Sequence, residues 1–127
     1  MNSAIALGVD LVEVSRFRQL SPAIRERFFK RVFTLKEREE IASSYERAAG
    51  IFAAKESLAK ALGCGIGPIS WQEIEVIKDD AGKPSLCLSG QAKALSQKAA
   101  IAEWSVSISH TRENAVAVVL GIGKNIG

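Results

Sequence analysis

The sequence is poor in residues that build metal and redox centres, and it has no long apolar run. Its two cysteines, Cys64 and Cys87, lie far apart and outside any CxxC or Cys/His grouping. We therefore expect neither a zinc site nor a redox dithiol, and both thiols should be reduced. No segment has the ~18 consecutive apolar residues that a membrane-spanning helix requires. The first residues lack the basic segment of a secretory signal and reach Asp10 early, so we expect a cytoplasmic protein with no membrane partner.

Repeats, linkers and low-complexity segments are also absent. A length of 127 residues, with 47% hydrophobic and 24% charged residues, predicts one domain over residues 1–127. Apolar alternation predicts strands, and alanine-rich stretches predict helices. The expected strands are 4–14, 70–78, 85–89, 104–110 and 115–123. The expected helices begin at Pro22, with Ser21 as its cap, at Thr34, where TLKE has the spacing of a capping box, at Glu46 and at Gly90. We expect the Thr34 helix to be a solvated surface helix and the Glu46 helix to run to Leu62.

The stretch FAAKESLAKALG, residues 52–63, places two lysines and a glutamate in an otherwise apolar helix. Phe52, Glu56 and Lys60 recur every four residues and form one row. Glu56 and Lys60 could be a surface pair that adds about 0.2–0.5 kcal/mol to the helix. The small residues around them instead indicate a helix packed on several sides, where each charge needs a partner.

The strand predicted at 4–14 carries one acid. AIALGVDLVEV is apolar and branched throughout, which is typical of a buried strand. Alternation puts the odd-numbered residues from Ile5 to Leu11 on one face and Asp10 on the other, among small residues. Asp10 could cap a turn or pair with an arginine. A metal ion is another partner that would keep this carboxylate ionised.

Residues 16–31 are strongly basic, with six cations against Glu26 alone. This excess indicates an anionic partner, either nucleic acid or an acidic protein. We expect the contacts to come from Arg16, Arg18, Arg25 and Phe28.

Two further features have weaker functional signals. The glycine-rich loop GCGIGP follows a helix C-terminus, where the helix dipole disfavours anions, so capping of the helix is the simpler interpretation. His110, the only histidine, ends a strand beside a polar turn, and a hydrogen-bonded structural role is the simpler interpretation for it.

Two motifs in this order resemble those of the phosphopantetheinyl transferases of the holo-acyl carrier protein synthase type. GVDLVEVSRF resembles the family's G-x-D followed six residues later by arginine, and FAAKESLAKALG resembles its second signature. DDAGKP and SISHTRENAVAVVL are similar to its remaining blocks, so the resemblance covers nearly the whole chain. It implies an α+β fold, a single compact domain in which an antiparallel sheet packs against a long central helix.

The resemblance also implies a reaction. A serine hydroxyl of an apo-acyl carrier protein would attack the β-phosphorus of coenzyme A and release adenosine 3′,5′-bisphosphate. Asp10 and Glu56 would bind Mg²⁺, an ion that uses few protein carboxylates, and Lys60 would lie beside the diphosphate. Lys60 would stabilise or protonate the leaving group, while Glu56 or a metal-held water would accept the serine proton. The residues implied in coenzyme A binding are Lys60, Gly63, Gly65, Pro84, His110 and Thr111.

The family's carrier proteins are acidic, which would account for the arginines from Arg16 onward. The family is also trimeric, with active sites near the interfaces, so the resemblance implies a homotrimer. One position departs from the family pattern. Ile51 stands where many members have arginine immediately before FAAKE, so that arginine's contact must be absent or come from another residue.

Two alternatives without chemistry remain. One is an RNA-binding module, but a sheet that reads RNA needs exposed aromatic residues, and the predicted strands contain only Trp71 and Trp104. We therefore expect no nucleic-acid partner. The other alternative is an adaptor for an acidic protein, in which Asp10 and Glu56 would be structural acids.

Overall fold

One long helix and an antiparallel sheet form the centre of the computed structural model, which describes residues 4–123. The sheet has three strands in the order β1-β5-β4, and a second sheet pairs β2 with β3. The strands are β1 (Ile5–Glu13), β2 (Ile74–Lys78), β3 (Pro84–Leu88), β4 (Ile101–His110) and β5 (Asn114–Gly123). The helices are α1 (Ser15–Arg18), α2 (Pro22–Val32), α3 (Leu35–Ile41), α4 (Tyr45–Ala61) and α5 (Gly90–Lys98). The predicted α+β class is confirmed; both extreme ends of the predicted domain lie outside the described residues.

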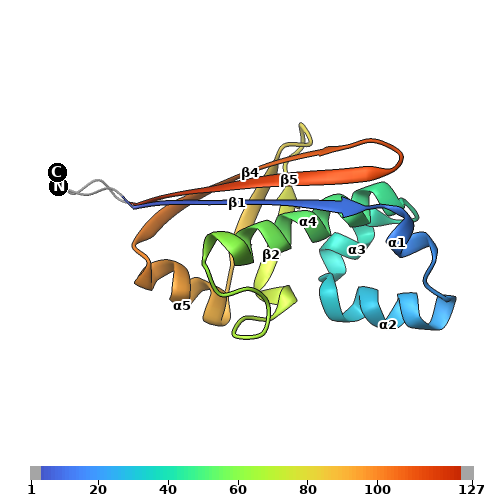
Figure 1. Ribbon diagram of the computed structural model, residues 1–127, viewed down its shortest axis with the longest axis horizontal. Coiled ribbons are helices and arrows are strands. Elements are labelled where there is room, and N and C mark those ends of the chain that lie inside the picture. The colour runs from blue at the N-terminus through green and yellow to red at the C-terminus, as the bar shows by residue number, and fades with distance from the viewer. Residues whose placement is uncertain (1–3, 124–127) are drawn as a thin grey trace.

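Figure 1 shows how these elements are layered. Helix α4 runs along one face of the three-stranded sheet, with α1, α2 and α3 near one end of the sheet and α5 near the other. The β2–β3 hairpin contacts α4 through β2 and contacts β4 through β3. Within residues 4–123, no helix is long and apolar enough to cross a membrane.

Helix α4 begins and ends where its sequence predicts. The side chain of Ser44 caps its first turn by accepting a hydrogen bond from the main-chain N–H of Arg47 at 3.1 Å. Gly63 follows the last turn with φ = 76°, a left-handed conformation that glycine adopts without steric cost. Nearly all of the helix between Ala48 and Ala59 is buried, which confirms the close packing on several sides.

The burial of β1 is the main correction to the sequence analysis. The predicted strand forms, but Ile5, Leu7, Val9 and Leu11 do not enter the core. Asp10 is partly buried, and Gly8 and Val12 beside it are buried against α4. The opposite face is exposed, with fractional exposures of 73% for Ile5, 65% for Leu7, 54% for Val9 and 66% for Leu11. The small-residue face faces inward because only small side chains leave room for the backbone of α4.

A cluster of aromatic rings packs the N-terminal helices α1 and α2 against α4. Phe52 on α4 stacks on Trp71 with ring centroids 4.9 Å apart and contacts Phe17 of α1 at 5.7 Å. Phe28 of α2 lies 5.8 Å from both Phe17 and Phe52. Such ring pairs contribute about 0.5–1.5 kcal/mol each beyond the burial of their area. The apolar residues of the basic segment therefore build the core, and they set the position of its arginines.

Two smaller predictions also needed correction. The strand expected from residue 70 begins at Ile74, because Trp71–Glu73 form a 3₁₀ turn. The capping box of α3 forms as predicted, but α3 is not a solvated helix throughout, because Glu37 is fully buried.

Candidate active site

The site is built where β1 crosses α4 at very short range. A Cβ atom added to Gly8 would lie next to the main-chain oxygen of Ser57 and 3.1 Å from the nitrogen of Ala61. Only glycine permits this approach. The hydroxyl of Ser57 also donates a hydrogen bond to the carbonyl oxygen of Ala117 on β5 at 2.9 Å. Helix α4 is therefore bonded to β5 as well. The relative position of Asp10 and the FAAKE stretch is therefore fixed by the backbone.

Asp10 and Lys60 form an ion pair across this crossing. Lys60 Nζ donates to Asp10 Oδ1 at 2.8 Å and to the carbonyl oxygen of Val9 at 3.2 Å. The Asp10 side chain is 16% exposed and the Lys60 side chain 53%, so the pair lies at the edge of the core and can be reached from solvent. The hydrogen bond to Asp10 and the charge of that carboxylate raise the pKa of Lys60.

Glu56 lies in the same electrostatic environment. Burial raises its pKa, and the negative charge of Asp10 raises it further, whereas Lys60 and Arg16 oppose the shift. The structure thus brings together the three residues predicted to be catalytic and one predicted partner-binding arginine. Two carboxylates that repel each other at a solvent-accessible edge make a place that favours a cation.

The donor set of this place suits Mg²⁺. Asp10 and Glu56 offer hard carboxylate oxygens, and Mg²⁺ commonly takes one or two such groups and fills its other positions with water and substrate phosphate. No group of three or more histidine, cysteine, aspartate or glutamate residues that could hold a metal occurs among residues 4–123. A site for a metal that requires a full set of protein ligands is therefore not found in that part of the chain.

A separate cavity of about 180 Å³ lies between α4, the β2–β3 hairpin and the end of β4. It brings together two of the residues predicted to bind coenzyme A, Pro84 and His110. Ile51, the residue that departs from the family pattern, lines the same cavity. The full lining is Glu46, Arg47, Gly50, Ile51, Lys78, Gly82, Pro84, Ile108 and His110.

Of the other predicted coenzyme A residues, Gly63 and Gly65 lie away from this cavity, whereas Thr111 directly follows His110 in the chain. Gly63 and Gly65 have φ values of 76° and 66° at the C-terminal end of α4. With a rise of 1.5 Å per residue, Gly63 is about 20 Å along the helix from Gly50. Thr111 is in the β4–β5 turn, where its hydroxyl accepts hydrogen bonds from the main-chain N–H groups of Glu113 and Asn114, each at 3.2 Å. Within one chain, Gly63 and Gly65 do not line the cavity that contains His110.

The basic residues have three different environments. Arg16 lies over the Phe52 ring at 5.9 Å and lines a cavity of about 100 Å³ that Phe28 also lines. Arg18 pairs with Glu46 at 2.8 Å and is about half exposed. The guanidinium of Arg25 donates to three main-chain carbonyl oxygens, those of Phe17, Arg18 and Leu20, which favours a structural role for it at the end of α1.

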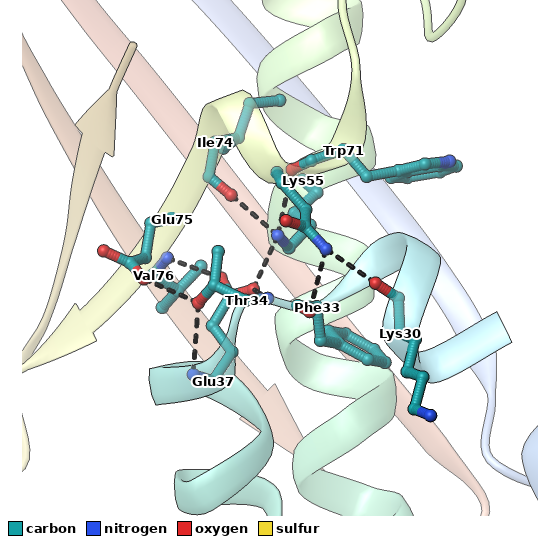
Figure 2. A network of polar contacts seen from close by, with 10 residues as sticks. Lys30, Phe33, Thr34, Glu37, Lys55, Trp71, Ile74, Glu75 and Val76 are labelled. Atoms are coloured by element: carbon teal, nitrogen blue, oxygen red, sulfur yellow. Dashed lines mark hydrogen bonds and ion pairs between the residues drawn. The ribbon is translucent and has the colours of Figure 1, made fainter. Parts of the chain in front are cut away.

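The sequence analysis gave no role to a buried ion pair next to Glu56. Lys55 and Glu37 are both fully buried, and Lys55 Nζ lies 2.6 Å from Glu37 Oε1. Lys55 also donates to the carbonyl oxygens of Trp71 at 3.0 Å and Ile74 at 2.7 Å. Figure 2 shows these contacts converging between α3, α4 and β2. Burial lowers the pKa of Lys55, and the carboxylate of Glu37 opposes that shift.

Glu37 is satisfied from both of its oxygens. Besides the lysine, it accepts hydrogen bonds from the main-chain N–H groups of Thr34 at 2.9 Å and Val76 at 2.7 Å. A buried charge pair is tolerated when additional hydrogen bonds satisfy it in this way. A signal was present in the sequence, because Lys55 falls on the same helix face as the apolar Ile51, Leu58 and Leu62.

Comparison with known proteins identifies the family of this chain. The family described as the 4′-phosphopantetheinyl transferase superfamily matches residues 6–119. The chain belongs to this superfamily. A holo-[acyl-carrier-protein] synthase from Caldanaerobacter subterraneus subsp. tengcongensis is 42% identical over 122 residues, which are 94% of this chain and 95% of that protein. One from Alkaliphilus oremlandii is 42% identical over 119 residues, 91% of this chain and 97% of that protein.

Solved structures of the superfamily have the same fold. Holo-[acyl-carrier-protein] synthase from Helicobacter pylori, in complex with coenzyme A, matches with a TM-score of 0.82 at 31% identity, over 91% of this chain and 98% of that one. The Bacillus anthracis enzyme, in complex with CoA (3′,5′-ADP), matches with a TM-score of 0.77 at 33% identity, over 97% of this chain and 100% of that one. The family resemblance and the class of enzyme predicted from the motifs are confirmed.

Proposed function

We propose that the chain transfers 4′-phosphopantetheine from coenzyme A to a serine hydroxyl of an apo-acyl carrier protein. The observation that carries this proposal is the meeting of Asp10, Glu56 and Lys60 at the crossing of β1 and α4, in a chain whose relatives are holo-[acyl-carrier-protein] synthases. The serine oxygen forms a bond to the β-phosphorus, and the bond from that phosphorus to the bridging oxygen breaks. The products are the holo-carrier protein and adenosine 3′,5′-bisphosphate.

Asp10 and Glu56 would hold Mg²⁺, which when bound offsets the negative charge of the diphosphate. Lys60 pairs with Asp10 at the same place, and Arg16 lies close enough to act on the charge of Glu56. The ammonium group of Lys60 can stabilise the oxygen of the leaving bisphosphate or donate a proton to it, and its raised pKa favours the first of these roles. We propose Glu56 as one acceptor for the serine proton, because it lies beside Asp10 and Lys60 at this place.

The cavity that contains Pro84 and His110 is our proposed site for part of coenzyme A. Arg47 lies one turn before Ile51 on α4, and both residues line this cavity together with Lys78. We propose that Arg47 supplies the cation that many relatives carry at position 51. Arg47→Gln should then raise the KM for coenzyme A several-fold, whereas Arg31→Gln, a change outside this cavity, should leave it unaltered.

Arg16 and Phe28 are the best placed residues to bind the acidic carrier protein. They line one small cavity next to Phe52, one turn before Glu56 on α4. Arg18 is less well placed to bind the carrier protein, because an acidic partner must compete with Glu46 for its guanidinium group. Arg25 already donates three hydrogen bonds to the main chain, and a contact with the carrier protein would be additional to these. Arg25→Glu would therefore disturb the end of α1 as well as binding of the carrier protein.

The exposed face of β1 supports association into a homotrimer. Val118 and Ile122 of β5 are 41% and 45% exposed, and they pair with Val9 and Ile5 of β1, so the apolar surface continues across two strands. Exposed apolar surfaces of this kind commonly mark protein interfaces. A neighbouring copy on this face could also supply the coenzyme A residues that one chain does not bring together. We infer a cytoplasmic location from the proposed substrates.

Mass spectrometry of an apo-carrier protein incubated with this protein, coenzyme A and Mg²⁺ tests the proposed function. We expect a mass gain of one phosphopantetheine group per carrier protein, with release of an equal amount of adenosine 3′,5′-bisphosphate. Asp10→Asn is the control and should give no gain. The absence of any gain with several carrier proteins would contradict transferase activity and favour the adaptor.

A further inference from the structure

Glu46 is the one acid among the residues that line the proposed coenzyme A cavity. The other titratable residues of that lining are Arg47, Lys78 and His110. Coenzyme A and adenosine 3′,5′-bisphosphate carry several negative charges, so a carboxylate beside their binding site repels them. Coenzyme A binding alone therefore does not explain an acid at position 46.

The carboxylate of Glu46 is paired with a cation that lies outside the cavity. Arg18, the last residue of α1, donates from a terminal guanidinium nitrogen to Glu46 Oε1 at 2.8 Å. Glu46 lies in the first turn of α4, and within residues 4–123 neither residue takes part in another ion pair. Arg18 does not line the cavity, so the pair connects the cavity to the surface at the end of α1.

Arg18 is also one of the residues that we expect to bind the acidic carrier protein. Its side chain is 48% exposed and that of Glu46 is 30% exposed, so a carboxylate of the carrier can reach this guanidinium from solvent. The guanidinium lies over the ring of Tyr45 at 5.8 Å, which holds it at the start of α4. An arginine binds a carboxylate best through two parallel hydrogen bonds. A carrier carboxylate that binds Arg18 therefore competes with Glu46 for the same guanidinium.

The two ligands act on this ion pair in opposite ways. When a carrier carboxylate takes Arg18, Glu46 remains beside the nucleotide without its counter-charge and repels the phosphate groups. A bound nucleotide favours the pairing of Glu46 with Arg18, which makes Arg18 less available to the carrier protein. By linkage, each ligand must change the affinity of the other by the same factor.

We propose that the Arg18–Glu46 ion pair couples the carrier-binding surface to the nucleotide cavity, so that an arriving carrier protein weakens the binding of adenosine 3′,5′-bisphosphate and promotes its release. Both ligands come from the proposed function, on which this coupling rests. An exposed ion pair typically changes an equilibrium by less than about fivefold, so we expect the carrier to raise the Kd of the bisphosphate by about two- to fivefold. High salt should reduce this factor, because both residues are exposed to solvent.

Calorimetric titration with adenosine 3′,5′-bisphosphate tests the coupling, because this product binds without turnover. The chain is titrated alone and with a saturating concentration of apo-carrier protein, at constant Mg²⁺. The carrier should raise the Kd in the unaltered chain, a measurement that needs no variant, but not in Glu46→Gln. Arg18→Gln should raise the Kd by about two- to fivefold even without the carrier, although Arg18 lies outside the cavity. Adding Glu46→Gln to Arg18→Gln should reverse that rise.

Two controls make the same changes of charge at other places. Arg27→Gln on α2 and Glu39→Gln on α3 are exposed changes outside the cavity, and neither should alter the Kd of the bisphosphate without carrier. An equal Kd with and without carrier in the unaltered chain would overturn the coupling. A double variant that binds the bisphosphate as weakly as Arg18→Gln alone would overturn it too, because Arg18 would then act without Glu46.

Mass spectrometry of the carrier protein, with the same preparation and coenzyme A, separates this coupling from the proposed function. Transfer of phosphopantetheine together with a Kd that the carrier does not change would refute the coupling and leave the function in place. A chain that transfers nothing to several carrier proteins would contradict both.

Discussion

Replacing Gly8 with alanine should push β1 away from α4. The new Cβ would lie next to the main-chain oxygen of Ser57, and neither that oxygen nor its helix can rotate away. Restoring an ordinary contact of at least 3.4 Å requires the strand and the helix to separate by more than about 1 Å. Overpacking of this kind typically costs about 1–3 kcal/mol of unfolding free energy.

The same displacement should act on the site. Lys60 Nζ and Asp10 Oδ1 are 2.8 Å apart, so an outward movement of about 1 Å takes them beyond hydrogen-bonding distance. A misplacement of this size can cost about 100-fold in rate. Transfer of phosphopantetheine, followed by mass spectrometry, should therefore fall far more than stability alone explains.

Ile41→Ala is the matched control, because it removes buried volume on α3 and should cost about 2–5 kcal/mol without moving β1. Urea unfolding measures both variants. Below the unfolding transition, Ile41→Ala should keep nearly normal turnover. If Gly8→Ala kept both normal stability and normal turnover, the steric argument for the site would be refuted.

Asp10→Asn should raise the Mg²⁺ concentration needed for half-maximal transfer or abolish transfer, and normal activity at limiting Mg²⁺ would contradict a shared metal site. Lys60→Ala should lower kcat more than it raises the KM for coenzyme A, and a pure KM effect would make Lys60 a ground-state anchor instead. Lys55→Met should cost about 3–5 kcal/mol in urea unfolding, because Glu37 is left charged and buried, and adding Glu37→Leu should restore only part of that loss, because the main-chain N–H groups of Thr34 and Val76 then lose their acceptor. Main-chain hydrogen bonds hold the pKa of Glu73 below its ordinary value of 4.5, so its stabilisation is complete above pH 4.5 and is lost as the pH falls through the lowered pKa. Glu73→Gln should accordingly flatten the acid side of the curve of Tm against pH, and an unchanged curve would be evidence against this contribution.

The sequence predicted the positions of the helices and strands better than it predicted which of their faces are buried. Helix α4, β1 and both hairpins follow from local patterns of period 3.6 and 2 and from turn residues. The inward face of β1 did not follow, because alternation separates two faces without saying which one is covered. Gly8 decides it, and the effect of that glycine depends on a helix almost fifty residues away in sequence.

The charged residues show the same limit. Glu37 fits a capping box on a surface helix, yet it is buried because α4 brings Lys55 to it. Arg25 fits a basic recognition segment, yet its guanidinium is engaged by the turn that follows α1. In contrast, Asp10, Glu56 and Lys60 could be grouped in advance, because their motifs as a set resemble one family.

Because β1 contributes to both the proposed association and the proposed metal site, the specific activity should depend on protein concentration. The strand carries Asp10 inward and a row of large apolar side chains outward, so the proposed association and the proposed metal site share one short segment of backbone. Anything that binds only the folded state adds to its stability by mass action. Dilution should therefore reduce melting temperature and specific activity together, at constant pH and Mg²⁺, and a substitution such as Leu7→Asp on the outward face should have the effect of dilution without touching the catalytic residues.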